Sequence, residues 1–266
     1  MASNIHQTAV IDPAAQIGAD VTIGAYSVIA GNCTIGDNTV IGPHVVLEEH
    51  THIGRECTIR SGAVLGGLPQ DLKFKGETSY VRVGDRNMIR EFVTIHRATG
   101  AEASTTVGDD NLVMAYVHIG HNCAISSRTM ISSYAALSGH VIVEDNVVIG
   151  GMVGVHQFVR VGKLAMLGGY SKVVVDVPPF MLADGRPADV LELNVRGLRR
   201  SGLSASSRTK LRLAYKLLYR SNLNITQALE AIEQEIEPED AVTYLTDFVK
   251  NISSGTSGRQ LDKPRR

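Results

Sequence analysis

The sequence contains no tryptophan and only five phenylalanines and eight tyrosines among its 266 residues. No segment approaches the ~20 consecutive apolar residues of a membrane-spanning helix, and the N-terminus lacks the apolar stretch of a secretory signal. The net charge is only −1 and no nucleic-acid-binding motif is present, which argues against nucleic acid as a partner. We therefore expect one cytoplasmic chain with a narrow aliphatic core and no membrane span.

What the sequence does contain is an aliphatic residue at every sixth position of its first two-thirds. Counting from Ile5, 26 of the 29 positions up to Val173 are isoleucine, leucine or valine. A period of six fits neither a 3.6-residue helix nor an alternating strand, but it fits a short strand followed by a turn. Three such hexapeptides form one coil, and successive coils stack at ~4.8 Å. The repeat therefore predicts a parallel β-helix, although its period leaves the hand of the helix open.

Two further positions of the repeat have an expected role. A smaller inward side chain follows four residues after an aliphatic position, and Cys33, Cys57 and Cys123 occur at such positions. We interpret these three cysteines as small core residues and expect neither a disulfide nor a metal site. Glycine often follows the aliphatic position directly, where we expect it to relieve the backbone at each corner.

The repeat is interrupted at residues 66–77 and 97–106, and it ends near Asp176. Interruptions of a solenoid commonly carry function. Beyond the repeat, the spacing of apolar residues predicts helices at residues 207–219, 226–236 and 241–249, whereas residues 253–266 are expected to be frayed. We divide the chain into a β-helix domain at residues 1–180 and a C-terminal helical domain at residues 181–266.

Charge is uneven in the C-terminal region. Between Arg186 and Arg220 there are nine basic residues but only two acidic ones, Asp189 and Glu192. Most of these residues are interpreted as a solvated helix face. The functional alternative is a docking surface for an acidic partner or a phosphate group.

Four histidines gather in one part of the repeat: His118, His121, His140 and His156. A step of three hexapeptides, which is one full coil, places His121, Gly139 and Gln157 in one column on three successive coils. The polar side chains of this corner are therefore expected within about 10 Å of one another. A single histidine would be unremarkable here, but a stacked group favours a functional site.

These residues resemble a known family. Residues 116–123, 138–140 and 150–158 resemble the active-site region of the UDP-N-acetylglucosamine acyltransferases that begin lipid A synthesis, and residues 66–74 resemble the sugar-binding loop of that family. Residues 193–200 and 214–220 resemble its C-terminal helices. The resemblance implies a left-handed parallel β-helix with a C-terminal α-helical domain, and a homotrimer with sites between subunits. It also implies transfer of an (R)-3-hydroxyacyl group from acyl carrier protein to the 3-position of UDP-N-acetylglucosamine without a cofactor.

The same resemblance implies a role for individual residues. His121 matches the general base and Gly139 matches the backbone N–H that holds the thioester oxyanion. The remaining matches are Asp71, Lys73 and His118 at the glucosamine; His140, His156 and Gln157 around the sugar and acyl chain; Asn194 and Arg200 near the nucleotide; and Gly169, which limits acyl-chain length.

Three positions depart from the family pattern. Asn122 replaces an aspartate that commonly follows the base, so the partner that orients the imidazole differs. Arg196 and Ser201 stand where the family usually has a glutamate that contacts the nucleoside and a second arginine, so we expect the details of nucleotide binding to differ.

Two other classes of function fit parts of the pattern. A trimeric β-helix with histidines can be a zinc enzyme of the γ-class carbonic anhydrase type, but the His-x4-His spacing of that class is missing, since His118 and His121 are three residues apart. A non-catalytic solenoid that binds a carrier protein would need no histidine cluster. The sequence leaves open whether the acceptor group is a hydroxyl or an amine.

Overall fold

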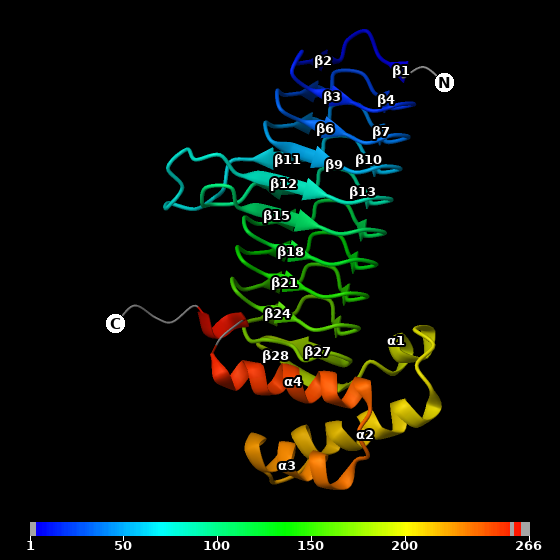
Figure 1. The fold of residues 1–266 in the computed structure, drawn as a ribbon, viewed down its shortest axis with the longest axis vertical. Helices are drawn as coiled ribbons and strands as arrows, with labels where there is room; N and C mark the ends of the chain where they lie inside the picture. The colour runs from blue at the N-terminus through cyan, green and yellow to red at the C-terminus, as the bar shows by residue number, and fades with distance from the viewer. Residues whose placement is uncertain (1–3, 256–257, 262–266) are drawn as a thin grey trace.

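The computed structural model describes residues 4–255 and 258–261 as a three-sided β-helix followed by helices (Figure 1). Three parallel sheets form the sides of a prism, and each coil contributes one short strand to each sheet. The strands of sheet A within the coils are β1 (Asn4–Ile5), β4 (Thr22–Ile23), β7 (Val40–Ile41), β10 (Thr58–Ile59), β13 (Met88–Ile89), β16 (Leu112–Val113), β19 (Met130–Ile131), β22 (Val148–Ile149) and β25 (Met166–Leu167).

The other two sides of the prism have the same construction. Sheet B consists of β2 (Val10–Ile11), β5 (Val28–Ile29), β8 (Val46–Leu47), β11 (Val64–Gly67), β14 (Thr94–His96), β17 (His118–Ile119), β20 (Ala136–Leu137), β23 (Gly154–Val155) and β26 (Lys172–Val173). Sheet C consists of β3 (Gln16–Ile17), β6 (Thr34–Ile35), β9 (Thr51–Ile53), β12 (Tyr80–Val83), β15 (Ser104–Val107), β18 (Ala124–Ile125), β21 (Ile142–Val143) and β24 (Arg160–Val161). The coils wind with a left hand, so the predicted fold class is confirmed.

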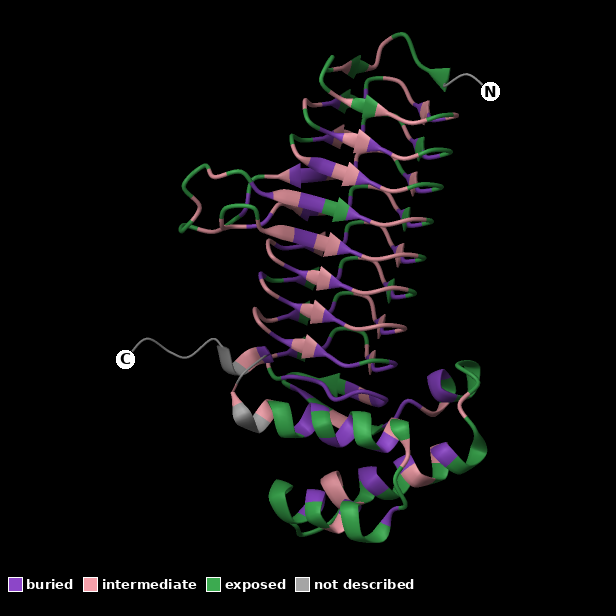
Figure 2. Ribbon diagram, viewed as in Figure 1, coloured by how far each residue is buried: buried purple, intermediate pink, exposed green. Residues whose placement is uncertain are grey.

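The aliphatic positions of the repeat fill the prism. Ile119 and Leu137 are fully buried, and so are the three cysteines, whose thiols are free. Figure 2 shows this buried core along the inside of the sheets. The first coil is less enclosed, since Ile5 at its open end is 44 % exposed.

Glycine has a different role from the expected one. The left-handed backbone at the corners is adopted by non-glycine residues such as Asn122 and His140, with φ of 58° and 60°. A Cβ atom on Gly24 would lie 2.6 Å from the carbonyl carbon of Gly42 on the next coil. Glycine after the aliphatic position is therefore needed because adjacent coils approach closely there, and not because of its φ angle.

Both interruptions protrude from the corner between sheets B and C (Figure 1). They lengthen two coils beyond the regular three hexapeptides, to 30 and 24 residues, as the pairings of neighbouring coils show. The second interruption is shorter than predicted, because residues 104–106 belong to β15 and pair with β12.

The C-terminal region begins with a hairpin that the sequence pattern did not predict. Strand β27 (Met181–Gly185) continues sheet A by pairing with β25, and β28 (Ala188–Leu193) pairs antiparallel with β27. The helices that follow are α1 (Val195–Arg200), α2 (Ala205–Tyr219), α3 (Ile225–Glu235) and α4 (Asp240–Ser254), and the 3-10 helix η1 spans Gly258–Leu261. The three predicted helices are confirmed as α2, α3 and α4, whereas the domain boundary at residue 180 stays a prediction.

Helix α4 is attached to the last coils by polar and aromatic contacts. The Tyr244 hydroxyl donates to Glu144 Oε2 at 2.7 Å, and the Arg160 guanidinium lies 4.2 Å from the Phe248 ring centroid. Residues 253–266 were expected to be frayed, but α4 continues to Ser254, and η1 spans Gly258–Leu261, where the Arg259 N–H donates to Asp176 Oδ1 at 2.9 Å. Residues 256–257 and 262–266 of that end lie outside the described residues. Within residues 4–255 and 258–261, no helix has the length and apolar character needed to cross a membrane.

Candidate active site

His121 lies at the corner that follows β17, between sheets B and C. Its Nδ1 atom is 2.8 Å from Asn122 Oδ1, and its main-chain carbonyl accepts a hydrogen bond from His140 N–H at 2.9 Å. The His140 ring stands edge-on to His121, with centroids 5.2 Å apart. The predicted stacking of this corner on successive coils is therefore present in the fold.

Gly139 occupies the next coil directly beside the His121 ring. A Cβ atom at this position would lie 2.4 Å from His121 Nε2, so only glycine allows the ring its observed place. Gly120 has a related role, because its Cβ atom would lie 3.0 Å from Gly139 N. Two glycines thus keep both the imidazole edge and the Gly139 amide free of side-chain atoms.

A cavity of about 290 Å³ opens at this point and is lined by His118, His121, Gly139 and Gln157. His118 is fixed by a 2.8 Å hydrogen bond between its Nδ1 atom and Thr94 Oγ1. Burial, together with the neighbouring His121, lowers the pKa of His118, because a charged imidazolium would lose solvation there. The cavity therefore combines the imidazoles of His118 and His121 with one exposed main-chain edge.

The first protruding loop supplies Asp71 and Lys73 to an adjoining cavity of about 530 Å³, whose lining includes His121 and His140. Asp71 Oδ1 accepts the Lys73 N–H at 3.0 Å, and this bond and the nearby His121 lower the pKa of Asp71. The loop is braced against the second interruption, since Glu77 Oε1 accepts the Gly100 N–H at 2.7 Å. An ionised carboxylate and an ammonium group therefore face the histidine corner from outside.

His140 and Phe158 form the wall of this second cavity. Their rings stack with centroids 4.5 Å apart and an interplanar angle of 9°. Burial first and His121 second lower the pKa of His140, which keeps this imidazole neutral at pH 7.

His156 faces a separate groove of about 230 Å³ that continues from the corner along sheet B. Its floor includes Gly154 and Ser138, and Lys172 lies at its far end. Gly154 pairs with Ala136 on one neighbouring strand and with Lys172 on the other, so the outer face of sheet B carries only small side chains here until it reaches the exposed Lys172.

Three predicted site residues lie elsewhere in the chain. Gly169 is exposed at the corner between sheets A and B, and Arg200 is exposed in the last turn of α1. Asn194 is only 6 % exposed; it caps α1 by accepting the Gly197 N–H at 3.0 Å, and its amide donates to the Leu164 carbonyl at 2.9 Å. These intramolecular bonds give Asn194 a structural role, and its contact with a nucleotide stays a prediction.

The departures from the family pattern differ in what surrounds them. Asn122 takes the position of the orienting acid next to His121, whereas Arg196 is an exposed residue of α1. Ser201 follows α1, and its hydroxyl donates to the Leu198 carbonyl at 2.9 Å.

The sequence pattern missed His96 and Gln70, which line the same cavity as His121. The His96 ring stands edge-on to His118 at 4.9 Å, and burial lowers its pKa to about 4. A step of three hexapeptides does not find His96, because its coil contains 24 residues. With a step of 24 residues for this coil, His96 falls in the same column as Gly120.

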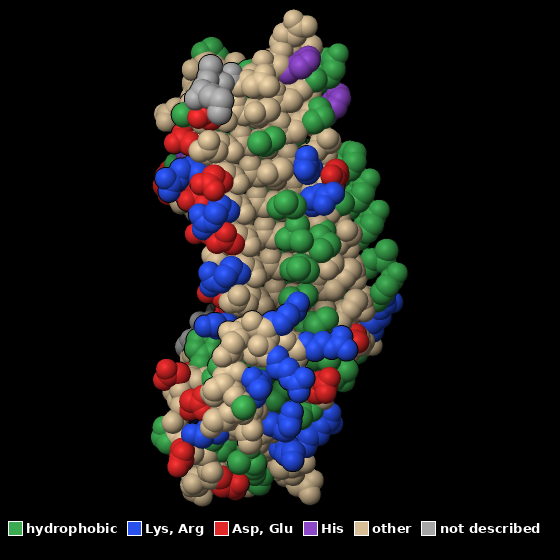
Figure 3. All heavy atoms as spheres, turned by 90° about the vertical axis from the view of Figure 1, so that its right-hand side faces the viewer, with side chains coloured by type: hydrophobic (Ala, Val, Ile, Leu, Met, Phe, Trp, Pro, Cys, Tyr) green, Lys and Arg blue, Asp and Glu red, His purple; other side chains and the backbone are tan. Residues whose placement is uncertain are grey.

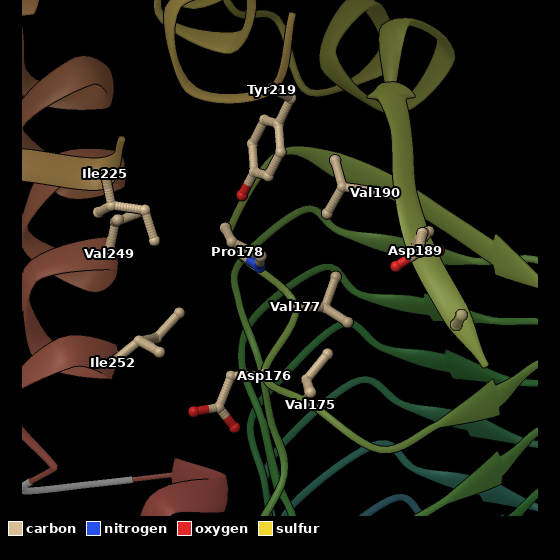
Figure 4. Close-up of a pocket in the computed structure, with 12 residues that line it drawn as sticks. Val175, Asp176, Val177, Pro178, Asp189, Val190, Tyr219, Ile225, Val249 and Ile252 are labelled. Atoms are coloured by element: carbon tan, nitrogen blue, oxygen red, sulfur yellow. The ribbon is translucent and has the colours of Figure 1, made fainter. Parts of the chain in front are cut away.

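An apolar cavity lies below the last coil, between the hairpin and the helices (Figure 4). It measures about 530 Å³, and the Tyr219 side chain points into it opposite Val249. The Asp176 carboxylate at its edge accepts the N–H groups of Arg160 and Arg259 at 2.7 and 2.9 Å, respectively, so it is engaged within the chain.

The zinc-enzyme alternative requires a group of potential metal ligands. Among residues 4–255 and 258–261, no three histidine, cysteine or acidic side chains are grouped so that they could hold a metal ion. The histidine corner therefore resembles an acid–base site more than a metal site.

The fold and this corner define a hexapeptide-repeat transferase. The profile described as bacterial transferase hexapeptide matches residues 2–36, 14–49 and 32–67, and the second domain of UDP-N-acetylglucosamine O-acyltransferase matches residues 176–258.

Individual relatives are similar over nearly the full length. The acyl-[acyl-carrier-protein]–UDP-N-acetylglucosamine O-acyltransferase of Paraburkholderia phymatum is 48% identical over 258 residues, which cover 95% of this chain and 98% of the relative. The solved structure of LpxA from Acinetobacter baumannii is 38% identical with a TM-score of 0.89, covering 93% of this chain and 96% of that one. The enzyme from Bacteroides fragilis is 39% identical with a TM-score of 0.90, covering 92% and 96%. The chain belongs to the UDP-N-acetylglucosamine O-acyltransferase family.

Proposed function

We propose that this protein transfers an (R)-3-hydroxyacyl group from acyl carrier protein to the glucosamine 3-hydroxyl of UDP-N-acetylglucosamine, as the first step of lipid A synthesis in the cytoplasm. The observation that carries the proposal is that His121 Nε2 lies directly against the backbone of Gly139, in the space that a Cβ atom would otherwise occupy. A base and a main-chain N–H side by side are what acyl transfer to a hydroxyl requires. The relatives are named O-acyltransferases, which favours the hydroxyl over an amine as acceptor.

In this mechanism His121 Nε2 removes the proton of the sugar 3-hydroxyl while the sugar oxygen attacks the thioester carbon. The negative charge that develops on the thioester oxygen is held by the Gly139 N–H. The C–S bond then breaks, and the imidazolium returns its proton to the thiolate of the carrier. Asp71 and Lys73, with His118 and Gln157, position the sugar at the mouth of the two cavities.

We also propose that three copies assemble around the edge between sheets A and B. This edge carries a ladder of exposed rings: Phe92 and Tyr116 stack at 5.1 Å, Tyr116 and Tyr134 at 4.9 Å, and each is about half exposed. The outer face of sheet A adds Met88 and Met130, which are 42 % and 38 % exposed. Figure 3 shows hydrophobic side chains along this side of the β-helix. A continuous apolar surface of this kind supports burial against another chain.

The proposed trimer brings the scattered site residues together. In a three-fold ring, each contact joins two different faces, and here sheet A of one copy would meet sheet B of the next. The site corner borders sheet B, and the basic helices α1 and α2 lie beyond the last coil (Figure 1). Figure 3 shows Lys and Arg side chains gathered at this end of the molecule. The exposed residues Arg200 and Gly169 of one copy would then lie against the histidine corner of its neighbour. Leu72, fully exposed at the tip of the first loop, is placed to contact that neighbour.

Acyl carrier protein is the proposed acidic partner of the basic helices. Arg212, Lys216 and Arg220 line a hollow of about 450 Å³ next to Tyr215. With three cations against the single carboxylate of Glu192 in its lining, this hollow favours an acidic surface or a phosphodiester group.

The direct test is an assay of the purified chain with UDP-N-acetylglucosamine and a mixture of 3-hydroxyacyl carrier thioesters, with the product identified by mass spectrometry. We expect a 3-O-acylated nucleotide sugar, and loss of turnover on the order of 10²–10⁴ in a folded His121→Ala variant. Absence of the acylated sugar with the wild-type chain would contradict the function. Full activity of folded His121→Ala would contradict the mechanism alone.

A further inference from the structure

The side chain of Asn122 is held by the main chain of a residue far away in the sequence. Asn122 Oδ1 accepts the Thr99 N–H at 2.9 Å, and Asn122 Nδ2 donates to the Thr99 carbonyl at 3.0 Å. The Asn122 N–H donates to Thr105 Oγ1 at 2.8 Å. Both partners belong to the coil that carries the second interruption.

These contacts allow only one orientation of the Asn122 amide. If oxygen and nitrogen were exchanged, the amide nitrogen would face the Thr99 N–H and the amide oxygen would face the Thr99 carbonyl, so both bonds would become repulsive. The atom that lies 2.8 Å from His121 Nδ1 is therefore the oxygen. An amide oxygen can only accept a hydrogen bond, so the proton is on His121 Nδ1.

We propose that the Thr99 peptide, acting through the Asn122 amide, fixes His121 in the tautomer that has its proton on Nδ1. The lone pair is then on Nε2, which is the nitrogen that faces Gly139. Asn122 is a positioning residue in this scheme, and the second interruption belongs to the machinery that prepares the base. The inference rests on the proposed role of His121 as that base.

A carboxylate could not replace the amide without a change in behaviour. Its first oxygen would still accept from His121 Nδ1–H and from the Thr99 N–H. Its second oxygen would face the Thr99 carbonyl at about the present 3.0 Å, where the amide now donates. A carboxylate would also place a negative charge next to the ring and favour the imidazolium form of His121, which the neutral amide does not.

Other titratable groups also face the ring of His121. They are the imidazoles of His96, His118 and His140, the carboxylate of Asp71 and the ammonium of Lys73. None of them changes between the wild-type chain and an Asn122 variant, so a displaced pH profile reports on residue 122.

The experiment compares Asn122→Ala and Asn122→Asp over a range of pH. In Asn122→Ala the ring can protonate on either nitrogen, so kcat should fall roughly 10- to 100-fold while both KM values stay within about threefold. In Asn122→Asp most of kcat should return, and the acidic limb of kcat/KM should move up by about one pH unit. A residue needed only for folding would lower stability without moving that limb.

Asn38→Ala is the matched control, because Asn38 has the same left-handed backbone (φ 59°) at an exposed corner. It should keep wild-type kcat and the wild-type profile. Wild-type kcat in Asn122→Ala, or an unchanged acidic limb in Asn122→Asp, would overturn the inference. If Asn122→Ala fails to fold, the Asn122→Asp profile decides alone. His121→Ala separates the two proposals: if it is inactive while Asn122→Ala is normal, only the role of Asn122 fails.

Discussion

Replacing Gly139 by alanine tests whether the position of the His121 ring limits the reaction. The added Cβ would lie 2.4 Å from Nε2 and 2.5 Å from Cε1, whereas an ordinary contact begins near 3.4 Å. The ring would have to move by about 1 Å, against its bond to Asn122. A displacement of that size at a reacting atom costs on the order of 10²-fold in rate.

The substitution spares the other parts of the site. Alanine keeps the N–H of residue 139, so the proposed oxyanion contact survives. Gly139 is not among the glycines with positive φ, so alanine fits its backbone. The remaining cost is that of moving the His121 ring away from Asn122, which should lower the free energy of unfolding by about 1 kcal/mol or less. The expected result is a kcat about 100-fold lower, with both KM values and the melting temperature nearly preserved.

Steady-state kinetics with purified substrates and a thermal melt provide the measurements. Gly31→Ala is the control, because Gly31 has the same place in a turn near the N-terminal end and its Cβ would only approach the Asp12 carboxylate at 3.3 Å. We expect wild-type kinetics for it. Wild-type kcat in a folded Gly139→Ala variant would show that the ring can move without consequence, and the assignment of His121 as base would be wrong.

Charge reversal at Arg208, Arg212 and Lys216 should raise the apparent KM for acyl carrier protein on the order of tenfold and weaken its salt dependence; a change confined to the nucleotide-sugar KM would contradict carrier docking there. Gly169→Met should shift product lengths toward acyl chains several carbons shorter, at roughly fourfold in relative rate per lost methylene, and an unchanged product profile by mass spectrometry would place the limit elsewhere. His96 should destabilise the fold as pH falls from 6.5 to about 4, because burial lowers the pKa of its imidazole in the folded chain while the unfolded chain takes up the proton. Because His96 is partly exposed, the loss of unfolding free energy between pH 7 and pH 5, measured by urea titration, should be smaller in His96→Gln than in the wild-type chain by on the order of 1 kcal/mol. An equal loss in both chains would refute the assignment.

The β-helix could be predicted from sequence because its core repeats with a fixed period. Each aliphatic position makes the same inward contact, so one rule describes most of the strands and the corner of His121 and Gly139. The hairpin β27–β28 escaped prediction, since it is held by a single pairing to β25 and not by the repeat.

Counting by period located the site residues only where each coil keeps its regular length of three hexapeptides, whereas Asp71 and Lys73 of the first interruption were found by their resemblance to the family's sugar-binding loop. His96 lies before an inserted segment, so its neighbours in space are not its neighbours by counting. Asn122 was identified as a departure, but its bonds to Thr99 depend on the path of a loop that has no period. Asn194 shows a different limit, because a sequence match carries no information about whether a side chain is already used in a cap.

The number of regular coils in the N-terminal part of the prism does not affect the geometry of the histidine corner. Coils contact only their immediate neighbours, and the first strands pair with one another in the same register as the later ones. Adding or removing one regular coil above β9 would lengthen or shorten the rod by one rung without altering the contacts between His121 and Gly139. The length of the rod at this end is therefore independent of the histidine corner, whereas a coil inserted between β17 and β20 would separate His121 from Gly139.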